Sequence, residues 1–66
     1  MSREEFMDYI RDNYDVSAEI LRLIDNILWY AATMLSSEEE RFDFLNLVLD
    51  GTIGLSEQEI RKIDLK

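Results

Sequence analysis

The sequence predicts an all-α fold: a small bundle of three main helices with a short fourth helix at the C-terminal end. Three observations support this prediction. Apolar residues recur at helical spacing along most of the chain, and no stretch shows the alternation of a strand. Ser2 and Ser56 are each followed three positions later by a glutamate, which is typical of helix starts. The 66 residues are expected to form one domain, 1–66, near the smallest size that supports a single core.

The first helix is expected at residues 2–13. Ser2 can cap it and Glu5 can return a hydrogen bond to the Ser2 amide, as in a capping box. The Asp and Asn residues after Arg11 end it, because their side chains compete for backbone hydrogen bonds.

The second helix, 17–35, is the longest and is expected to be central, with Ser17 as its N-cap. Its apolar residues are expected to form one broad buried face at about 100° per residue. These residues are Ile20, Leu23, Ile24, Ile27, Leu28, Ala31, Met34 and Leu35.

The third helix is expected at residues 37–50, since its three initial glutamates suit the positive end of a helix dipole. Gly51 is expected to end it in the left-handed conformation. Its apolar residues cover an arc of roughly 220°, which is wide for a surface helix. We therefore expect this helix either to be sandwiched or to lie in a subunit interface. Ser56 and Glu59 form a second capping box and predict a short helix at 56–64.

The composition excludes several classes of function. The chain has no cysteine and no histidine, so it lacks the usual ligands of zinc and the usual nucleophiles and bases of enzymes. Carboxylate pairs such as Glu4 and Asp8 are expected to face solvent. We expect no enzyme, no cofactor and no metal site. No run of about 18 apolar residues suggests a membrane span and no secretory signal is recognisable, so we expect a cytoplasmic protein.

The net charge of −8 argues against direct binding to nucleic acid or to anionic lipid. The charge is uneven along the chain. Residues 1–19 hold six acids and two bases, and residues 37–50 hold five acids and one base, whereas residues 20–36 between them hold one of each. The acidic segments can serve solubility alone or complement a basic partner.

Residues 46–57 resemble half of the calcium loop of the EF-hand family. Asp50, Gly51, Thr52, Ile53 and Glu57 match the fifth to eighth and the twelfth places of that loop. Asn46 and Val48 depart from the pattern at the first and third places, where the family has oxygen ligands. The resemblance implies a weak calcium site as a minor alternative function, and a helix ended by glycine accounts for the same residues without a metal.

The second helix also carries the strongest indication of a partner. Trp29 lies among polar residues, which is the composition of an interface anchor with a polar rim. The alternative is that another helix of the same chain covers it. We expect a non-catalytic protein-protein interaction module that self-associates as a homodimer, because two-fold association is the commonest closed arrangement. The predicted partner-binding residues are Trp29, Arg22, Asp25, Asn26, Tyr30, Thr33, Phe44 and Leu47.

The main alternative is an acidic inhibitor that occupies a basic or nucleic-acid-binding site on another protein. Small acidic helical proteins of this kind include phage-encoded inhibitors such as anti-CRISPR proteins, which the chain resembles in its general character. The residues that would carry such binding are Glu4, Asp8, Asp12, Glu38, Glu39 and Asp43.

Overall fold

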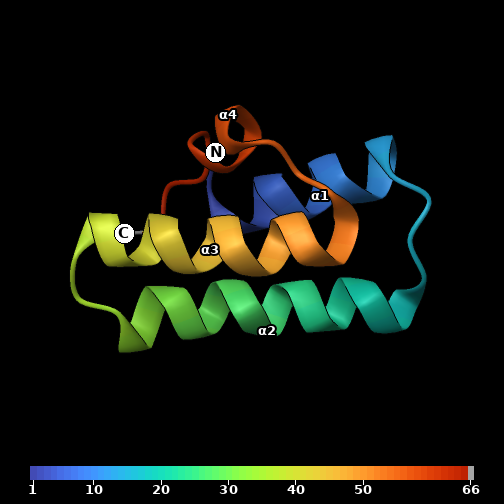
Figure 1. Cartoon of the computed structure of the whole chain (residues 1–66). Helices are drawn as coiled ribbons and strands as arrows, with labels where there is room; N and C mark the ends of the chain where they lie inside the picture. The colour runs from blue at the N-terminus through green and yellow to red at the C-terminus, as the bar shows by residue number, and fades with distance from the viewer. Residues whose placement is uncertain (66) are drawn as a thin grey trace.

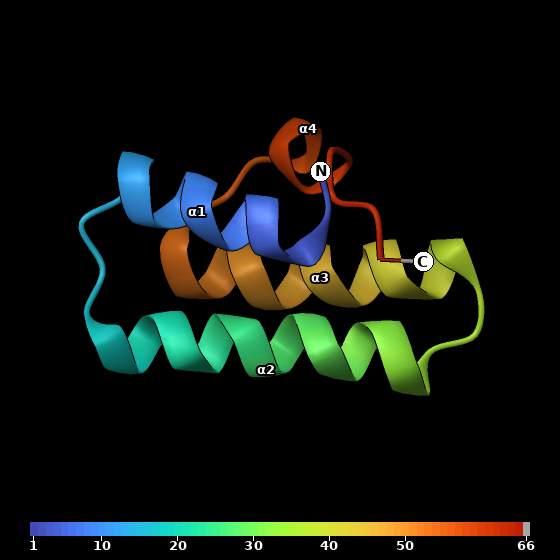
Figure 2. The same cartoon turned by 180° about the vertical axis from the view of Figure 1, so that it is seen from behind.

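Four helices and no strand make up the computed structural model, which describes residues 1–65. The helices are α1 (Arg3–Asn13), α2 (Ala18–Met34), α3 (Glu38–Ile53) and α4 (Glu57–Ile60). Figures 1 and 2 show α2 along one edge of the molecule, with α1 and α3 beside it and α4 on the opposite side. The predicted small helical bundle is confirmed.

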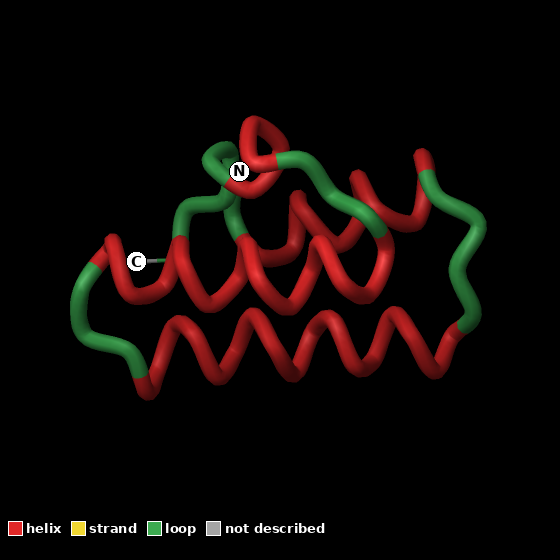
Figure 3. Tube along the Cα trace, viewed as in Figure 1, coloured by secondary structure: helices red, strands yellow, loops and turns green. Residues whose placement is uncertain are grey.

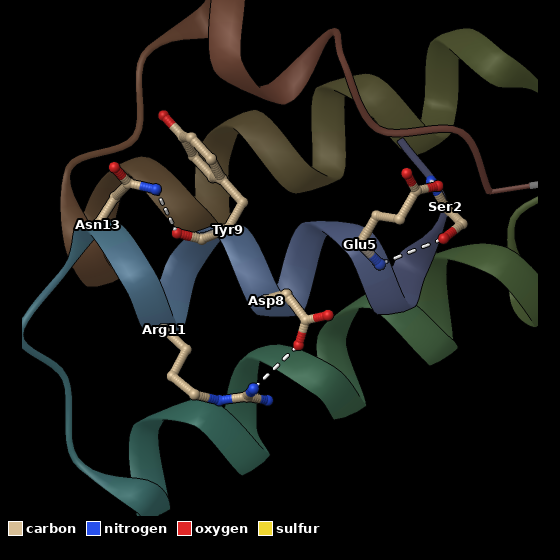
Figure 4. Close-up of polar contacts among 6 residues, drawn as sticks. All are labelled: Ser2, Glu5, Asp8, Tyr9, Arg11 and Asn13. Carbon is tan, nitrogen blue, oxygen red and sulfur yellow. Dashed lines mark hydrogen bonds and ion pairs between the residues drawn. The ribbon is translucent and has the colours of Figure 1, made fainter.

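A serine precedes each helix, and its hydroxyl oxygen accepts a hydrogen bond from the backbone N–H three residues later. In α1 the Glu5 amide donates to Ser2 at 3.2 Å, and the Glu5 carboxylate accepts from the Ser2 amide at 3.1 Å (Figure 4). Ser56 and Glu59 make the same reciprocal pair at the start of α4. The predicted capping boxes are therefore confirmed, because these contacts depend only on neighbouring residues.

The predicted end of the third helix is wrong. Gly51 lies inside α3, and the helix ends at Ile53. Gly54 caps it in the left-handed conformation at φ 70° and donates its N–H to the Asp50 carbonyl. The added turn brings Ile53 against the core and leads directly to the buried Leu55. Burying these two side chains outweighs the cost of about 1 kcal/mol for a glycine in a helix.

The two glycines are expected to respond in opposite ways to substitution by alanine. Gly51→Ala should stabilise the protein by about 0.5 kcal/mol, because the residue is helical and a new Cβ would meet no atom within 4 Å. Gly54→Ala should destabilise it by about 1 kcal/mol, because an L side chain strains the left-handed conformation. Urea unfolding of both variants tests this, and equal midpoints would contradict it.

The core lies between all four helices. It consists of Phe6, Ile10, Ile24, Leu28, Ala31, Leu45, Leu49, Leu55 and Ile60, each at most 3% exposed. α2 packs against both other main helices, and α4 packs against α3. The predicted broad buried face of α2 is only partly correct, because Ile24, Leu28 and Ala31 are buried whereas Leu23 and Met34 are exposed.

The N-terminal residue contacts the segment that follows α4. The Asp64 amide donates to the Met1 carbonyl at 2.6 Å, and the amino group of Met1 donates to the Lys62 carbonyl. The predicted fourth helix, 56–64, is shorter than expected, because α4 ends at Ile60 and gives way to a turn (Figure 3). These contacts with Met1 add to the turn hydrogen bonds that the Lys62 and Ile63 amides donate to the Glu59 and Ile60 carbonyls.

Candidate interaction surface

α2 carries two apolar stripes, and each residue of one stripe directly precedes a residue of the other in the sequence. The inner stripe, formed by Ile24, Leu28, Ala31 and Leu35, packs in the core. The outer stripe, formed by Leu23, Ile27, Tyr30 and Met34, lies about 100° further round the helix. Within it Leu23 is 46% exposed, Tyr30 is 44% exposed and Met34 is 64% exposed. Because α1 and α3 cover only one side of α2, the bundle buries one stripe and leaves much of the other in solvent.

α3 extends this apolar surface beside the middle of α2. The rings of Tyr30 and Phe44 lie 5.3 Å apart between centroids. Leu47, one turn further along α3 from Phe44, is 77% exposed. A side chain of this size and chemistry is rarely left in solvent without a partner, particularly beside other exposed apolar groups. Two of the predicted partner-binding residues, Tyr30 and Phe44, are thus brought into contact, and Leu47 lies next to them.

Trp29 is 54% exposed, so no helix of the described chain covers it. It lies about 100° from Tyr30 around α2, on a separate side from the outer stripe. The Thr33 hydroxyl donates to the Trp29 carbonyl at 2.8 Å, and Arg22 and Asn26 are exposed. The predicted cluster therefore divides into two surfaces, one around Trp29 and one around Tyr30.

Asp25, the remaining predicted partner-binding residue, is half-buried and faces α1. Its carboxylate lies 3.6 Å from Arg3 Nε. This ion pair joins α1 to α2, and both side chains are near half exposed, so its contribution to stability is small. Asp25 belongs to the margin between helices rather than to the exposed apolar surface.

The predicted acidic residues lie on the surface in two groups, each beside arginines. Glu4 and Asp8 line a shallow cleft between α1 and α2 together with three arginines, and Asp8 pairs with Arg11 at 2.9 Å (Figure 4). Glu38, Glu39 and Asp43 line a second cleft that also contains Arg41 and Arg61. Asp12 is exposed at the end of α1. The nearby arginines reduce the net charge of both acidic groups.

A cluster of Tyr9, Tyr14 and Glu59 joins α1 and the residue after it to α4, and sequence reasoning missed it. One carboxylate oxygen of Glu59 accepts from the Tyr14 hydroxyl at 2.6 Å and from the Tyr9 hydroxyl at 2.7 Å. The other oxygen accepts from Ser56. No sequence signal identifies this cluster, since the glutamate is 45 residues from Tyr14 and 50 from Tyr9.

These hydrogen bonds shift all three pKa values away from neutrality. The bonds from Tyr14 and then from Tyr9 lower the pKa of Glu59 to about 2. The bond to Glu59, with desolvation, raises the pKa of Tyr14 to about 12, and the same bond raises the pKa of Tyr9. A general acid or base works best with a pKa near the operating pH. The cluster is therefore suited to holding α4 in place rather than to proton transfer.

The segment that resembles an EF-hand loop is helical over its first eight residues. Asn46, Val48 and Asp50 lie in α3, where successive side chains point outward around the helix instead of converging on one ion. Across residues 1–65 no group of three or more His, Cys, Asp or Glu side chains is placed to hold a metal.

Two members of the outer stripe, Leu23 and Met34, were assigned to the buried face, and helical periodicity does not distinguish them from the buried residues. The spacing of residues 23, 27, 30 and 34 repeats that of 24, 28, 31 and 35, and one helix of a small bundle does not bury both stripes.

None of the helices in the described part of the chain is long and apolar enough to cross a membrane. No known protein family, curated protein or solved structure matches this chain.

Proposed function

We propose that this protein is a non-catalytic protein-protein interaction module that self-associates as a homodimer through the exposed apolar surface of α2 and α3. One observation is the main support for this proposal. Leu23, Met34 and Leu47 are exposed although the core is complete without them. Adjacent exposed apolar side chains of this size mark interaction sites in soluble proteins.

The absence of cysteine and histidine from the sequence supports a binding role over a catalytic one. The groups that remain for acid-base chemistry have pKa values far from neutrality where they cluster, at Tyr14 and Glu59. Both tyrosine hydroxyls donate to Glu59, and the second oxygen of Glu59 accepts from Ser56, so the cluster is occupied by contacts within the fold.

Sedimentation velocity at micromolar concentration tests self-association. We expect the wild-type chain to sediment as a dimer. Met34→Glu should sediment as a monomer, with dimerisation weakened about 30-fold or more, because a carboxylate would replace an exposed apolar contact. The matched control is Gln58→Glu, which adds the same charge at an exposed position on α4 and should remain dimeric. A wild-type chain that stays monomeric would overturn the proposal.

The salt dependence of the same experiment distinguishes the homodimer from the acidic inhibitor. Two chains of charge −8 repel each other, so added salt should strengthen self-association by screening. An inhibitor that binds a basic site by charge would instead lose affinity as salt rises. A dimer that weakens steeply between about 0.05 and 0.5 M salt would contradict an apolar interface.

A further inference from the structure

The outer stripe of α2 has the spacing of a coiled-coil seam. Leu23, Ile27, Tyr30 and Met34 are separated by four, three and four residues, which is the alternation of the a and d positions of a heptad repeat. In such a seam each apolar side chain inserts between side chains of a facing helix. In this chain Ile27 packs partly against the core and Tyr30 contacts Phe44 of α3, whereas Leu23 and Met34 at the two ends of the stripe are exposed. α2 forms an outer edge of the molecule (Figures 1 and 2).

The separations of four, three and four residues are the same whether the helix is followed from its N-terminus or from its C-terminus. If a second α2 is laid antiparallel across the first, with a two-fold axis midway between Ile27 and Tyr30, every outer residue meets an outer residue. Leu23 then lies opposite Met34 of the partner subunit, and Ile27 lies opposite Tyr30 of the partner subunit. A two-fold interface requires this kind of self-complementary patch.

The charge distribution also favours a second copy as the occupant. Residues 26–37 contain no charged side chain, although the whole chain carries a charge of −8. α1 and α3 both display exposed carboxylates. Two carboxylates flank the uncharged stretch: Asp25, which is paired with Arg3, and Glu38, which is exposed at the start of α3. Residues 26–34 of α2 therefore offer another copy of this acidic chain a surface with little like-charge repulsion.

We propose that the outer stripe of α2 packs antiparallel against the same stripe of a second copy, with Leu23 facing Met34 of the partner subunit. This inference rests on the proposed function and specifies its interface. Tyr30, which stacks against Phe44, lies near the two-fold axis and is held by α3. Trp29 lies outside this contact.

Disulfide cross-linking tests the antiparallel arrangement directly, because the chain has no cysteine of its own. Two single variants, Leu23→Cys and Met34→Cys, are oxidised separately and as an equal mixture, and the linked dimer is measured on a non-reducing gel. A disulfide forms only when the Cα atoms lie within about 7 Å. We expect the mixture to give at least about fivefold more linked dimer than either variant alone, because only the mixture places facing thiols within that distance.

Circular dichroism establishes that each variant is folded, and Leu23→Cys mixed with Gln58→Cys measures cross-linking by random collision, since Gln58 is exposed on α4. If each single variant links efficiently with itself, the helices pair in parallel. That result overturns the antiparallel arrangement and leaves the proposed homodimer standing. If no mixture exceeds the control while the wild type sediments as a dimer, another surface makes the interface. If the wild type is monomeric, the proposed function fails as well.

Discussion

Leu28→Ala is expected to remove most or all of the stability of the fold. Leu28 is fully buried at the centre of the inner stripe, and truncating a buried leucine to alanine costs about 2 to 5 kcal/mol. A chain of 66 residues has a total free energy of unfolding of roughly 3 to 10 kcal/mol. Circular dichroism in a urea titration should therefore show an unfolding midpoint far below that of the wild type, or no folded baseline.

Leu47→Ala is the matched control for this experiment, since it removes the same atoms from a side chain that is largely exposed. Its free energy of unfolding should lie within about 0.5 kcal/mol of the wild type. Both variants are compared at concentrations low enough to keep the chain monomeric, because dimerisation would add apparent stability. If Leu28→Ala and Leu47→Ala lower the free energy of unfolding equally, α2 and α3 do not pack as described.

Glu59→Gln is expected to cause the second largest loss of folding stability. Glutamine can still complete the capping box with Ser56, but it loses the charge that strengthens the hydrogen bonds from Tyr9 and Tyr14. We expect a loss of about 1 to 2 kcal/mol at neutral pH, allowing for partial exposure to solvent. This corresponds to a fall of about 5 to 15 °C in melting temperature for a domain of this size.

The pH dependence of stability gives a separate check on the cluster. Folding lowers the pKa of Glu59 from its ordinary 4.5 to about 2, so its contribution is complete above about pH 4.5 and disappears as the pH falls towards 2. Folding raises the pKa of Tyr14 from 10 to about 12, so its contribution is complete below about pH 10 and disappears as the pH rises towards 12.

The difference in stability between wild type and Glu59→Gln should therefore narrow towards pH 2. Glu57→Gln is the control, because Glu57 is an exposed residue in an exposed ion pair with Arg61, and its loss should change stability by less than about 0.5 kcal/mol. If Glu57→Gln lowers the free energy of unfolding as much as Glu59→Gln does, the cluster of Tyr9, Tyr14 and Glu59 does not have the stabilising role assigned to it.

The exposed apolar residues of α2 and α3 were predicted from the sequence in part. Phe44 and Leu47 were identified because the apolar arc of the third helix is wider than a small monomer is expected to bury, and Tyr30 was identified as a neighbour of Trp29. Leu23 and Met34 were missed because helical periodicity alone does not show how wide the buried arc of a helix is. That width depends on how many helices pack against it, and α2 is covered on one side only.

The sequence by itself determined the helices and their beginnings. Ser2, Ser17 and Ser56 cap the helices as predicted, because a cap involves residues no more than three positions apart and needs no tertiary contact. Periodicity likewise sufficed to show that Ile24, Leu28 and Ala31 face the core.

Tertiary structure alone decided three features. It placed the left-handed cap of α3 at Gly54 instead of Gly51, it joined Glu59 to Tyr9 and Tyr14, and it left Leu23 and Met34 of the outer stripe exposed. Each of these features depends on contacts between residues far apart in the chain, or on which side of a helix its neighbours occupy. Local propensity and helical periodicity carry no information about either, because both describe one segment of the chain at a time.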